Sequence, residues 1–290
     1  MTLITDRKMD EERALYGTHD IELKNCAFDG PADGESAIKE CSDISAENVL
    51  FNLRYPGWHV HGLRIKDSDM TDKCRAALWY SDNIEIQNTK LHGIKALREC
   101  ADVSISGSDI ISPEFGWSVR RVSIRNSGAE SEYFMMRSSD LTLDHVDLKG
   151  KYSFQYVINA EISSCNLDTK DAFWHSENVT VKDSVINGEY LGWYSENLKL
   201  INCTVTGTQP FCYCRGLVLE NCRMTGTDLC FERSDVQADI LTPVISIKNP
   251  LSGRITVPGV GEIIRDIPEA AGEINVTGGI VPAQIKESRM

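Results

Sequence analysis

The chain has 290 residues, ten cysteines and a formal net charge of -13. This charge disfavours nucleic acid, anionic membranes and long polyanions as partners, because binding to them needs a basic face. No stretch is apolar enough to span a membrane, and the segment from Met1 to Arg13 is charged where a secretory signal would be apolar. We therefore expect a cytoplasmic protein that binds neither nucleic acid nor membrane.

A repeated pattern begins close to the N-terminus. The segment Asp20-Ile-Glu-Leu-Lys-Asn-Cys26 places the apolar pair Ile21 and Leu23 between polar turn residues, and we call the first apolar residue of such a pair the frame residue. The next frame residues are Ile44, Leu63 and Ile84, at spacings of 23, 19 and 21 residues. The extra residues should form loops, and the turn formers of residues 30–34 make one of them.

From Ile84 onward the spacing is a strict 19 residues. Asparagine or aspartate precedes most frame residues, and a third apolar residue and often a glycine follow each pair. The frame residues of this run are Val103, Val122, Leu141, Ala160, Val179, Leu198 and Leu217. A fixed period of this length marks a repeat architecture.

A 19-residue unit is too short for repeats that contain a helix, and the apolar alternation is that of short strands. The pattern predicts an all-β fold, a parallel β-helix with about 19 residues per coil and coils about 4.8 Å apart. Each coil should bury its apolar residues inside and turn at its Asn, Asp and Ser residues.

The pattern changes after Glu232. Val236, Ile255 and Ile274 keep the 19-residue spacing, but the polar turn residues disappear and prolines recur. We therefore predict a parallel β-helix over residues 1–233, and degenerate coils or a Pro/Gly-rich C-terminal cap of the same domain over residues 234–290. Such a cap would protect the last open edge of the solenoid.

Most of the cysteines recur at two positions of the repeat. One set follows the first strand (Cys26, Cys165, Cys203, Cys222), and the other lies three residues before a frame residue (Cys41, Cys100, Cys214). We expect free thiols that stack on their equivalents in adjacent coils rather than disulfides. Cys212, Cys214 and Cys230 lack a second pair at zinc-finger spacing, so no metal or other cofactor is predicted.

All five tryptophans lie five residues before a frame residue, in what we call the tryptophan column. Lysine, arginine and glutamine occupy the same column in other coils, and these side chains resist burial. Strict alternation with the small residues two positions later would turn the rings inward, whereas a kink would turn them outward. Both orientations stay open. The tryptophans are Trp58, Trp79, Trp117, Trp174 and Trp193.

The following column, which we call the stripe, is rich in tyrosine, histidine and charged residues. It contains too many charges to be interior, so we predict an exposed stripe. Aromatic faces pack on sugar rings, and the polar groups beside them bind hydroxyls, which suits an oligosaccharide. The alternative is a solvated face on which tyrosines and charges pair with their neighbours.

The candidate site residues come from these two columns. A histidine can titrate near neutrality and an arginine can lower the pKa of a carboxyl group, which suggests catalytic roles for Glu40, His59, Arg98, Glu99, Arg137 and His175. Glu40 and Glu99 are about 14 Å apart at this coil spacing, too far for the paired carboxylates of a glycosidase. The candidate ligand-binding residues are Tyr80, Tyr156, Tyr194, Tyr213 and the five tryptophans.

Two further sequence features bear on function. Arg64-Ile-Lys66 looks like a polygalacturonase motif, but it occupies an ordinary strand position of the repeat, and the aspartate-rich motifs of those enzymes have no counterpart. Several arginines and lysines cluster in the N-terminal half, so a small anionic ligand stays open. Members of that cluster include Arg54, Arg75, Lys95, Arg120, Arg121 and Arg125.

The repeat resembles a known but uncharacterised family. The segments that carry the resemblance are Arg54-Tyr-Pro-Gly-Trp58, Ala77-Leu-Trp-Tyr80, Asp171-Ala-Phe-Trp174, Gly188-Glu-Tyr-Leu-Gly-Trp193 and Ile247-Lys-Asn-Pro-Leu-Ser-Gly253. The chain is similar to a bacterial family of single-stranded parallel β-helices of the pectin-lyase-like type. This resemblance implies a right-handed coil over nearly the whole chain. It implies no activity, because the family is a domain of unknown function.

Three functional hypotheses follow. The first is a carbohydrate-binding or carbohydrate-active protein that uses the stripe and, if it is an enzyme, resembles a polysaccharide lyase or glycoside hydrolase. The second is a cytoplasmic lyase or isomerase of a small anionic sugar. The third is a non-catalytic scaffold that self-associates, with a homo-oligomer as its form.

Overall fold

The computed structural model describes residues 1–278, which contain strands and turns and no helix. Accordingly, no helix in this range has the length and apolar composition of a membrane span. The chain divides into two compact units, unit 1 over residues 1–167 and unit 2 over residues 168–290. Both are built from parallel strand pairs, and we describe each unit by itself.

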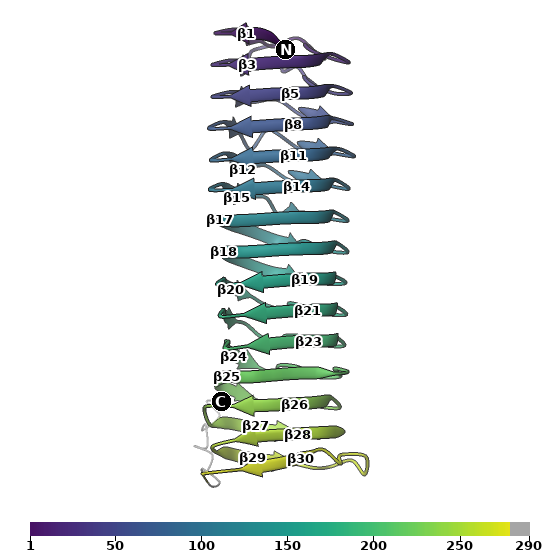
Figure 1. The fold of residues 1–290 in the computed structure, drawn as a ribbon, viewed down its shortest axis with the longest axis vertical. Helices are drawn as coiled ribbons and strands as arrows, with labels where there is room; N and C mark the ends of the chain where they lie inside the picture. Colours follow the sequence, from purple (N-terminus) through teal and green to yellow (C-terminus); the bar gives the residue numbers. More distant parts are fainter. Residues whose placement is uncertain (279–290) are drawn as a thin grey trace, which may run out of the picture. The chain divides into compact units, whose positions relative to one another are not determined.

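In unit 1 each coil contains a strand that carries the frame residue. Figure 1 shows β3, β5, β8, β11 and β14 lying beside one another in chain order. The strands of this sheet are β1 (Thr2–Thr5), β3 (His19–Lys24), β5 (Ser42–Glu47), β8 (His61–Lys66), β11 (Asp82–Gln87), β14 (Ala101–Ser106), β17 (Arg120–Phe134), β18 (Ser139–Ser153) and β19 (Ile158–Ser163).

Shorter strands complete the coils of unit 1. The second strand of the early coils is β2 (Lys8–Met9), β4 (Ala27–Phe28), β6 (Leu50–Phe51), β9 (Asp69–Met70), β12 (Lys90–His92) or β15 (Asp109–Ile111). The third is β7 (Gly57–Trp58), β10 (Leu78–Trp79), β13 (Leu97–Arg98) or β16 (Glu114–Phe115). In β17 and β18 the strand pairing continues past the left-handed corner residues Asn126 and His145, so one long strand takes the place of all three shorter strands.

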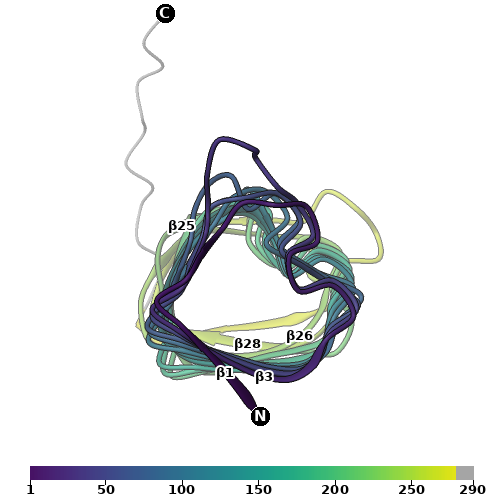
Figure 2. The same cartoon turned by 90° about the horizontal axis from the view of Figure 1, so that it is seen from above.

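The register of unit 1 confirms the predicted spacings. Ile21 is paired with Ile44, Ile44 with Leu63 and Leu63 with Ile84, which reproduces the spacings of 23, 19 and 21 residues. The strict 19-residue spacing follows, from Ile84 to Val103. In Figure 2 the coils of this unit follow a common path, from which purple and blue loops of the early coils project. The solenoid with about 19 residues per coil is therefore confirmed.

Unit 2 has the same construction, and β20 (Asn166–Thr169) contains the boundary between the units. The strands that follow β20 can be traced in Figure 1, where most of them are labelled. They are β21 (Glu177–Lys182), β22 (Val185–Asn187), β23 (Glu196–Ile201), β24 (Thr204–Thr208), β25 (Leu217–Asp228), β26 (Asp235–Ile240), β27 (Val244–Lys248), β28 (Ser252–Val257), β29 (Val260–Ile264) and β30 (Glu273–Val276).

The segment predicted as degenerate coils or a cap forms regular strands, β26 to β30, up to Val276. Its predicted register is wrong by two residues at the first step, because Val236 is paired with Gly253 and Ala238 with Ile255, whereas the 19-residue step from Ile255 to Ile274 is confirmed. A side chain at position 253 would collide with the carbonyl oxygen of Val236, so the short coil places a glycine there. The remainder of the predicted cap, residues 279–290, lies outside the described residues.

The corners of the coils are residues with left-handed backbone. The residue before the frame residue has a positive φ in nearly every coil, as in Asp43, Asn83 and Asn197. Asparagine and aspartate tolerate this conformation because their short side chains bond locally to the backbone. The predicted turns at Asn and Asp are confirmed.

The core contains stacked aromatic and thiol side chains. Phe28 stacks on Phe51 with ring centroids 5.2 Å apart, and Phe115 stacks on Phe134 at 5.7 Å. All ten cysteines are free and buried, as predicted. The thiol of Cys214 donates to the carbonyl oxygen of Gly192 in the preceding coil, and the Ser138 hydroxyl bonds to that of Gly116 in the same way. Cysteine and serine therefore fill the same structural position.

Candidate functional site: the stripe and its hollow

The stripe is a row of left-handed turn residues. Tyr80 has a φ of 53° and Tyr194 a φ of 59°, and the other stripe residues from Glu40 to Tyr213 share this conformation. This turn breaks the alternation of the strand, so the tryptophan column and the stripe both lie at the surface. The tryptophans are half-buried, Tyr80 and Tyr194 are 44% and 43% exposed, and the small residues after them are buried. The kink is therefore the correct alternative, and most of the stripe is exposed as predicted, while Glu99, Tyr213 and Glu232 are half-buried.

In unit 1 the tryptophan column combines rings with cations, and Trp58 meets Trp79 edge-on with ring centroids 5.2 Å apart. The Lys39 ammonium lies 5.9 Å from the Trp58 ring, and the Arg98 guanidinium lies 4.9 Å from the Trp79 ring and 5.1 Å from the Trp117 ring. The Arg98 guanidinium also bonds to the carboxylate of Glu99, at 3.4 Å. The guanidinium of Arg98, a predicted catalytic residue, is thus in contact with two rings and one carboxylate of the protein itself.

In unit 2 the column begins with two neutral rings. Trp174 and Trp193 stack at 5.4 Å with an interplanar angle of 6°. Their indole N–H groups donate to the backbone carbonyls of Tyr190 and Gln209, at 2.6 and 2.8 Å. The next positions of the column, Cys212 and Phe231, are fully buried. The indole N–H groups of these two predicted ligand-binding residues therefore hold adjacent coils together.

The stripe of unit 1 makes local contacts, and of the predicted catalytic residues it brings Glu99 together with the adjacent Arg98. The Tyr16 hydroxyl donates to the Glu40 carboxylate at 2.9 Å, and His59 stacks on Tyr80 at 5.2 Å. Farther along, the Arg137 guanidinium lies 5.5 Å from the Tyr156 ring. The two predicted carboxylates Glu40 and Glu99 are separated along the column by His59 and Tyr80, as the spacing indicated.

The stripe of unit 2 brings three predicted residues together. His175 stacks on Tyr194 at 5.0 Å, and Tyr194 stacks on Tyr213 at 4.8 Å, with interplanar angles of 6° and 12°. These rings line a hollow of about 220 Å³ together with Glu196 and Arg215. The hollow therefore combines hydroxyl, imidazole, carboxylate and guanidinium groups on one surface.

The charges at this hollow are mostly paired. Arg215 Nη1 lies 3.4 Å from Glu196 Oε1, and Lys248 Nζ lies 3.0 Å from Glu232 Oε1. Burial, and then the nearby Glu232 carboxylate, raise the pKa of the Tyr213 hydroxyl. Tyr213 therefore stays protonated at neutral pH and is able to donate a hydrogen bond.

Sequence reasoning missed Glu196 and Arg215. Each lies two residues after a stripe tyrosine, in a column that also contains Glu177. An acidic and a basic residue 19 positions apart in a strict repeat must be cross-strand neighbours, as the bridge between Glu196 and Arg215 shows. That opposite-charge spacing is the signal that could have found them.

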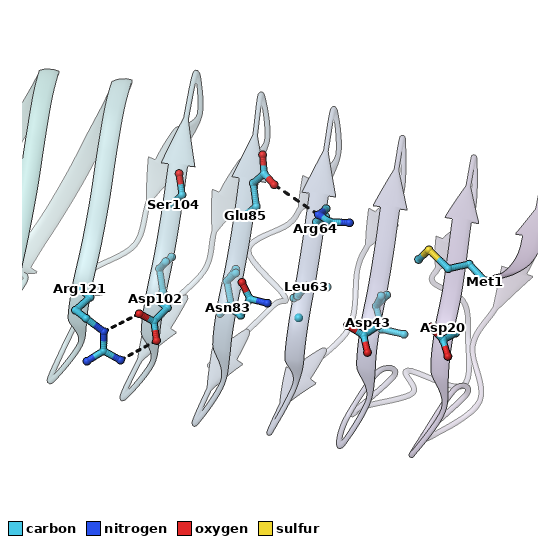
Figure 3. A pocket seen from close by; sticks show the side chains of 14 residues that line it. Met1, Asp20, Asp43, Leu63, Arg64, Asn83, Glu85, Asp102, Ser104 and Arg121 are labelled. Atoms are coloured by element: carbon cyan, nitrogen blue, oxygen red, sulfur yellow. Dashed lines mark hydrogen bonds and ion pairs between the residues drawn. The ribbon is translucent and has the colours of Figure 1, made fainter.

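A second hollow, of about 490 Å³, lies in unit 1 and contains none of the predicted site residues. Figure 3 shows the row of corner residues along it, from Asp20 to Arg121. Gly62 interrupts this row without a side chain, and the Arg121 guanidinium makes two bonds to Asp102, at 2.6 and 2.7 Å. These bonds lower the pKa of the Asp102 carboxyl. Along this side of the hollow, corner residues of successive coils therefore form a row of side chains with a gap at Gly62.

Other sequence features also have structural explanations. In the Arg64-Ile-Lys66 segment, Ile65 is buried and the two cations are exposed on β8, as the repeat pattern indicated. Among residues 1–278, no group of three or more His, Cys, Asp or Glu side chains is arranged to hold a metal ion.

Several solved structures are similar to this chain at low identity. The pentapeptide repeat protein HetL from the cyanobacterium Nostoc sp. strain PCC 7120 is 11% identical, with a TM-score of 0.32, and 77% of this chain and 92% of that chain are covered. Tailspike protein 3 of bacteriophage CBA120 is 10% identical, with a TM-score of 0.33 and coverage of 99% and 52%. The A-module of the Azotobacter vinelandii mannuronan C-5 epimerase AlgE6 is 11% identical, with a TM-score of 0.29 and coverage of 97% and 89%. These scores are too low to carry an argument about this chain.

No curated protein matches the sequence. A family model does match it, over residues 2–276, and its description is protein of unknown function (DUF3737). Because the match spans nearly all of the sequence, the chain belongs to this family.

Proposed function

We propose that this protein binds a small carbohydrate in the hollow of unit 2. The observation that carries the proposal is the convergence of His175, Tyr194, Glu196, Tyr213 and Arg215 around about 220 Å³. Pockets for drug-sized ligands measure about 300–1,000 Å³, so this hollow suits roughly one sugar ring. A chain of sugars would extend from it along the stripe.

The ligand would contact the edges of the aromatic rings rather than their faces. Tyr194 has His175 on one side and Tyr213 on the other, both nearly parallel to it. A sugar could stack on the Tyr194 face only by displacing one of these rings. The binding mode expected from the sequence, in which ring faces pack on the sugar, therefore gives way at Tyr194 to hydrogen bonds from the tyrosine hydroxyls.

The ion pair between Glu196 and Arg215 complements the hydroxyls. A carboxylate accepts and a guanidinium donates, and both groups are planar and bidentate. Two neighbouring sugar hydroxyls can bond to such a pair without breaking it. This arrangement supports a ligand with a vicinal diol.

A thermal-shift series tests the proposal. A ligand that binds only the folded protein raises its melting temperature, so at least one neutral monosaccharide should do so at millimolar concentration. Tyr194→Phe, which removes one hydroxyl, should reduce that shift. Tyr80→Phe is the matched control, because Tyr80 is equally exposed, also stacks on a histidine and lies in unit 1. No shift with any monosaccharide, or equal losses in both variants, would contradict this site.

A separate observation favours self-association as a second candidate function. Within residues 1–278, the first strand β1 is paired on one side, with β3, and its Leu3 is 55% exposed. An exposed strand edge without a charge is a template for another strand. Sedimentation of the full chain should then reveal a dimer that Leu3→Lys weakens, and a monomer at all concentrations would exclude this candidate.

A further inference from the structure

The charges around the hollow of unit 2 select among sugars, and this inference rests on the proposed function. Glu196 and Arg215 neutralise each other, and so do Glu232 and Lys248. Arg233 and Asp235, in the next coil, carry opposite charges. On the His175 side of the hollow, Glu177 is the charged residue two positions farther along the chain.

Glu177 lies beside the hollow. It is paired in register with Glu196, and it follows His175 by two residues, so it is next to two residues that line the hollow. It is exposed, and within the described part of the chain it has no ion-pair partner. Because Arg215 is already engaged by Glu196, the Glu177 carboxylate presents an uncompensated negative charge to a ligand.

We propose that the hollow prefers a sugar that bears a protonated amine, with Glu177 as the residue that recognises the ammonium group. An ammonium group placed on the Glu177 side replaces a sugar hydroxyl and forms an ion pair with this carboxylate, while the diol stays on Glu196 and Arg215. A carboxylate-bearing sugar in the same pose would be repelled by Glu177 and Glu196. The small anionic ligand that the sequence left open is therefore disfavoured at this hollow.

Four sugars with one skeleton test this preference. Glucose, glucosamine, N-acetylglucosamine and glucuronate differ in whether they carry a hydroxyl, an ammonium, an amide or a carboxylate. Binding is measured by isothermal titration or by ligand-observed NMR at pH 6.5 and low salt. We expect glucosamine to bind about five-fold more tightly than glucose, the factor of one solvent-exposed ion pair, and glucuronate to bind most weakly. Added salt should reduce the difference.

Variants assign the effect to one residue. Glu177→Gln should remove the preference, so that the ratio of the glucosamine affinity to the glucose affinity falls to about one. Glu262→Gln removes the same charge from an exposed position on β29 and should change neither affinity. Circular dichroism of both variants checks that the fold is retained.

The outcomes separate this inference from the proposed function. Equal binding of glucose and glucosamine, or tighter binding of glucuronate, would overturn the amine preference and leave carbohydrate binding intact. A preference for glucosamine that survives Glu177→Gln would overturn the role of Glu177. No binding of any of the four sugars would overturn both proposals.

Discussion

The tryptophan column is built differently in the two units. In unit 1 Trp58 meets Trp79 edge-on and the cations of Lys39 and Arg98 lie against the rings, whereas in unit 2 Trp174 stacks face to face on Trp193 and the column then enters the core. Both solutions cover ring faces with a neighbour from the adjacent coil. A half-buried column of a solenoid thus accommodates either an aromatic ring or a long cationic side chain, because both pack favourably against the aromatic ring of the adjacent coil.

The stripe differs between the units as well. In unit 1 its contacts include His59 with Tyr80 and Arg137 with Tyr156. In unit 2 three rings follow one another, and a carboxylate and a guanidinium lie beside them. In unit 2 the continuous run of rings and the ion pair thus lie at one hollow. The following experiments test this comparison, in order of decreasing expected effect.

Alkaline pH should have the largest effect, because both units bury thiols. Burial raises the pKa of Cys74 and Cys100 in unit 1, and of Cys230 in unit 2, to about 12 from the ordinary value of 9.0. The unfolded chain then loses protons that the folded chain retains, so stability present below about pH 9 is lost as the pH rises towards 12. We expect the free energy of unfolding to fall by several kcal/mol between pH 9 and pH 11, at roughly 1.4 kcal/mol per pKa unit and site. The urea midpoint should fall with it.

Single thiol variants show which unit contributes to this loss. Cys100→Ala and Cys230→Ala should each make the fall of the midpoint between pH 9 and 11 shallower. A midpoint that stays constant over this range would contradict the burial of the thiols. An unchanged slope in one variant alone would assign the effect to the other unit.

Two glycines at equivalent positions of the repeat should respond unequally to substitution. Gly116 and Gly192 both have a φ of 73° and precede a tryptophan. A Cβ at 192 would lie 2.8 Å from the ring of Phe211, which is fully buried, whereas a Cβ at 116 would meet the flexible side chain of Met135. We expect Gly192→Ala to cost about 2–3 kcal/mol and Gly116→Ala about 1–2 kcal/mol, from overpacking and left-handed strain. Equal costs in urea denaturation would show that the two sites relax alike.

Removal of the cation between two rings should destabilise unit 1 moderately. Arg98→Met keeps a long side chain but removes both cation–π contacts, worth about 0.5–1 kcal/mol each at exposed sites. Lys39→Met is the control, because Lys39 contacts one ring at the longer distance of 5.9 Å. The free energy of unfolding should fall about twice as far in the arginine variant. A larger loss in the lysine variant would contradict the stronger contribution expected from the two ring contacts of Arg98.

Truncation of stripe tyrosines should have the smallest effect on stability. Tyr156 and Tyr194 are 45% and 43% exposed, so Tyr156→Ala and Tyr194→Ala should each lower the free energy of unfolding by about 1 kcal/mol, the worth of lost ring stacking. Tyr194→Ala should in addition abolish sugar binding. A loss above about 3 kcal/mol in both variants, the cost of deleting a core aromatic residue, would mean that the rings belong to the core.

Much of the fold was predictable from the spacing of apolar residues. The frame residues from Ile21 to Val103 pair as predicted, even where loops change the coil length, because a shift of one residue would turn every apolar side chain to the wrong face. The register failed at Val236, where the coil shortens to 17 residues. The true partner of Val236 there is a glycine, Gly253. The apolar pattern instead favoured Ile255, two residues later, as the partner.

The candidate site was predictable only in part. The stripe residues His175, Tyr194 and Tyr213 stood out by composition, and the structure brings them together at one hollow. Their charged neighbours Glu196 and Arg215 did not stand out, because exposed charged residues are common at the ends of strands. Among the many charged pairs of the solenoid, the adjacent run of rings makes this one distinctive.

The sequence by itself determined the period, the inward columns and the exposure of the stripe, because a repeated apolar pattern has one register that buries it and charged columns cannot be interior. Only the tertiary structure decided which way the tryptophans face. That direction depends on a left-handed residue at the stripe, which tyrosine, histidine, glutamate and arginine adopt here without a glycine to signal it. The same turn creates the hollow, since it exposes successive rings beside the ion pair of the neighbouring strands.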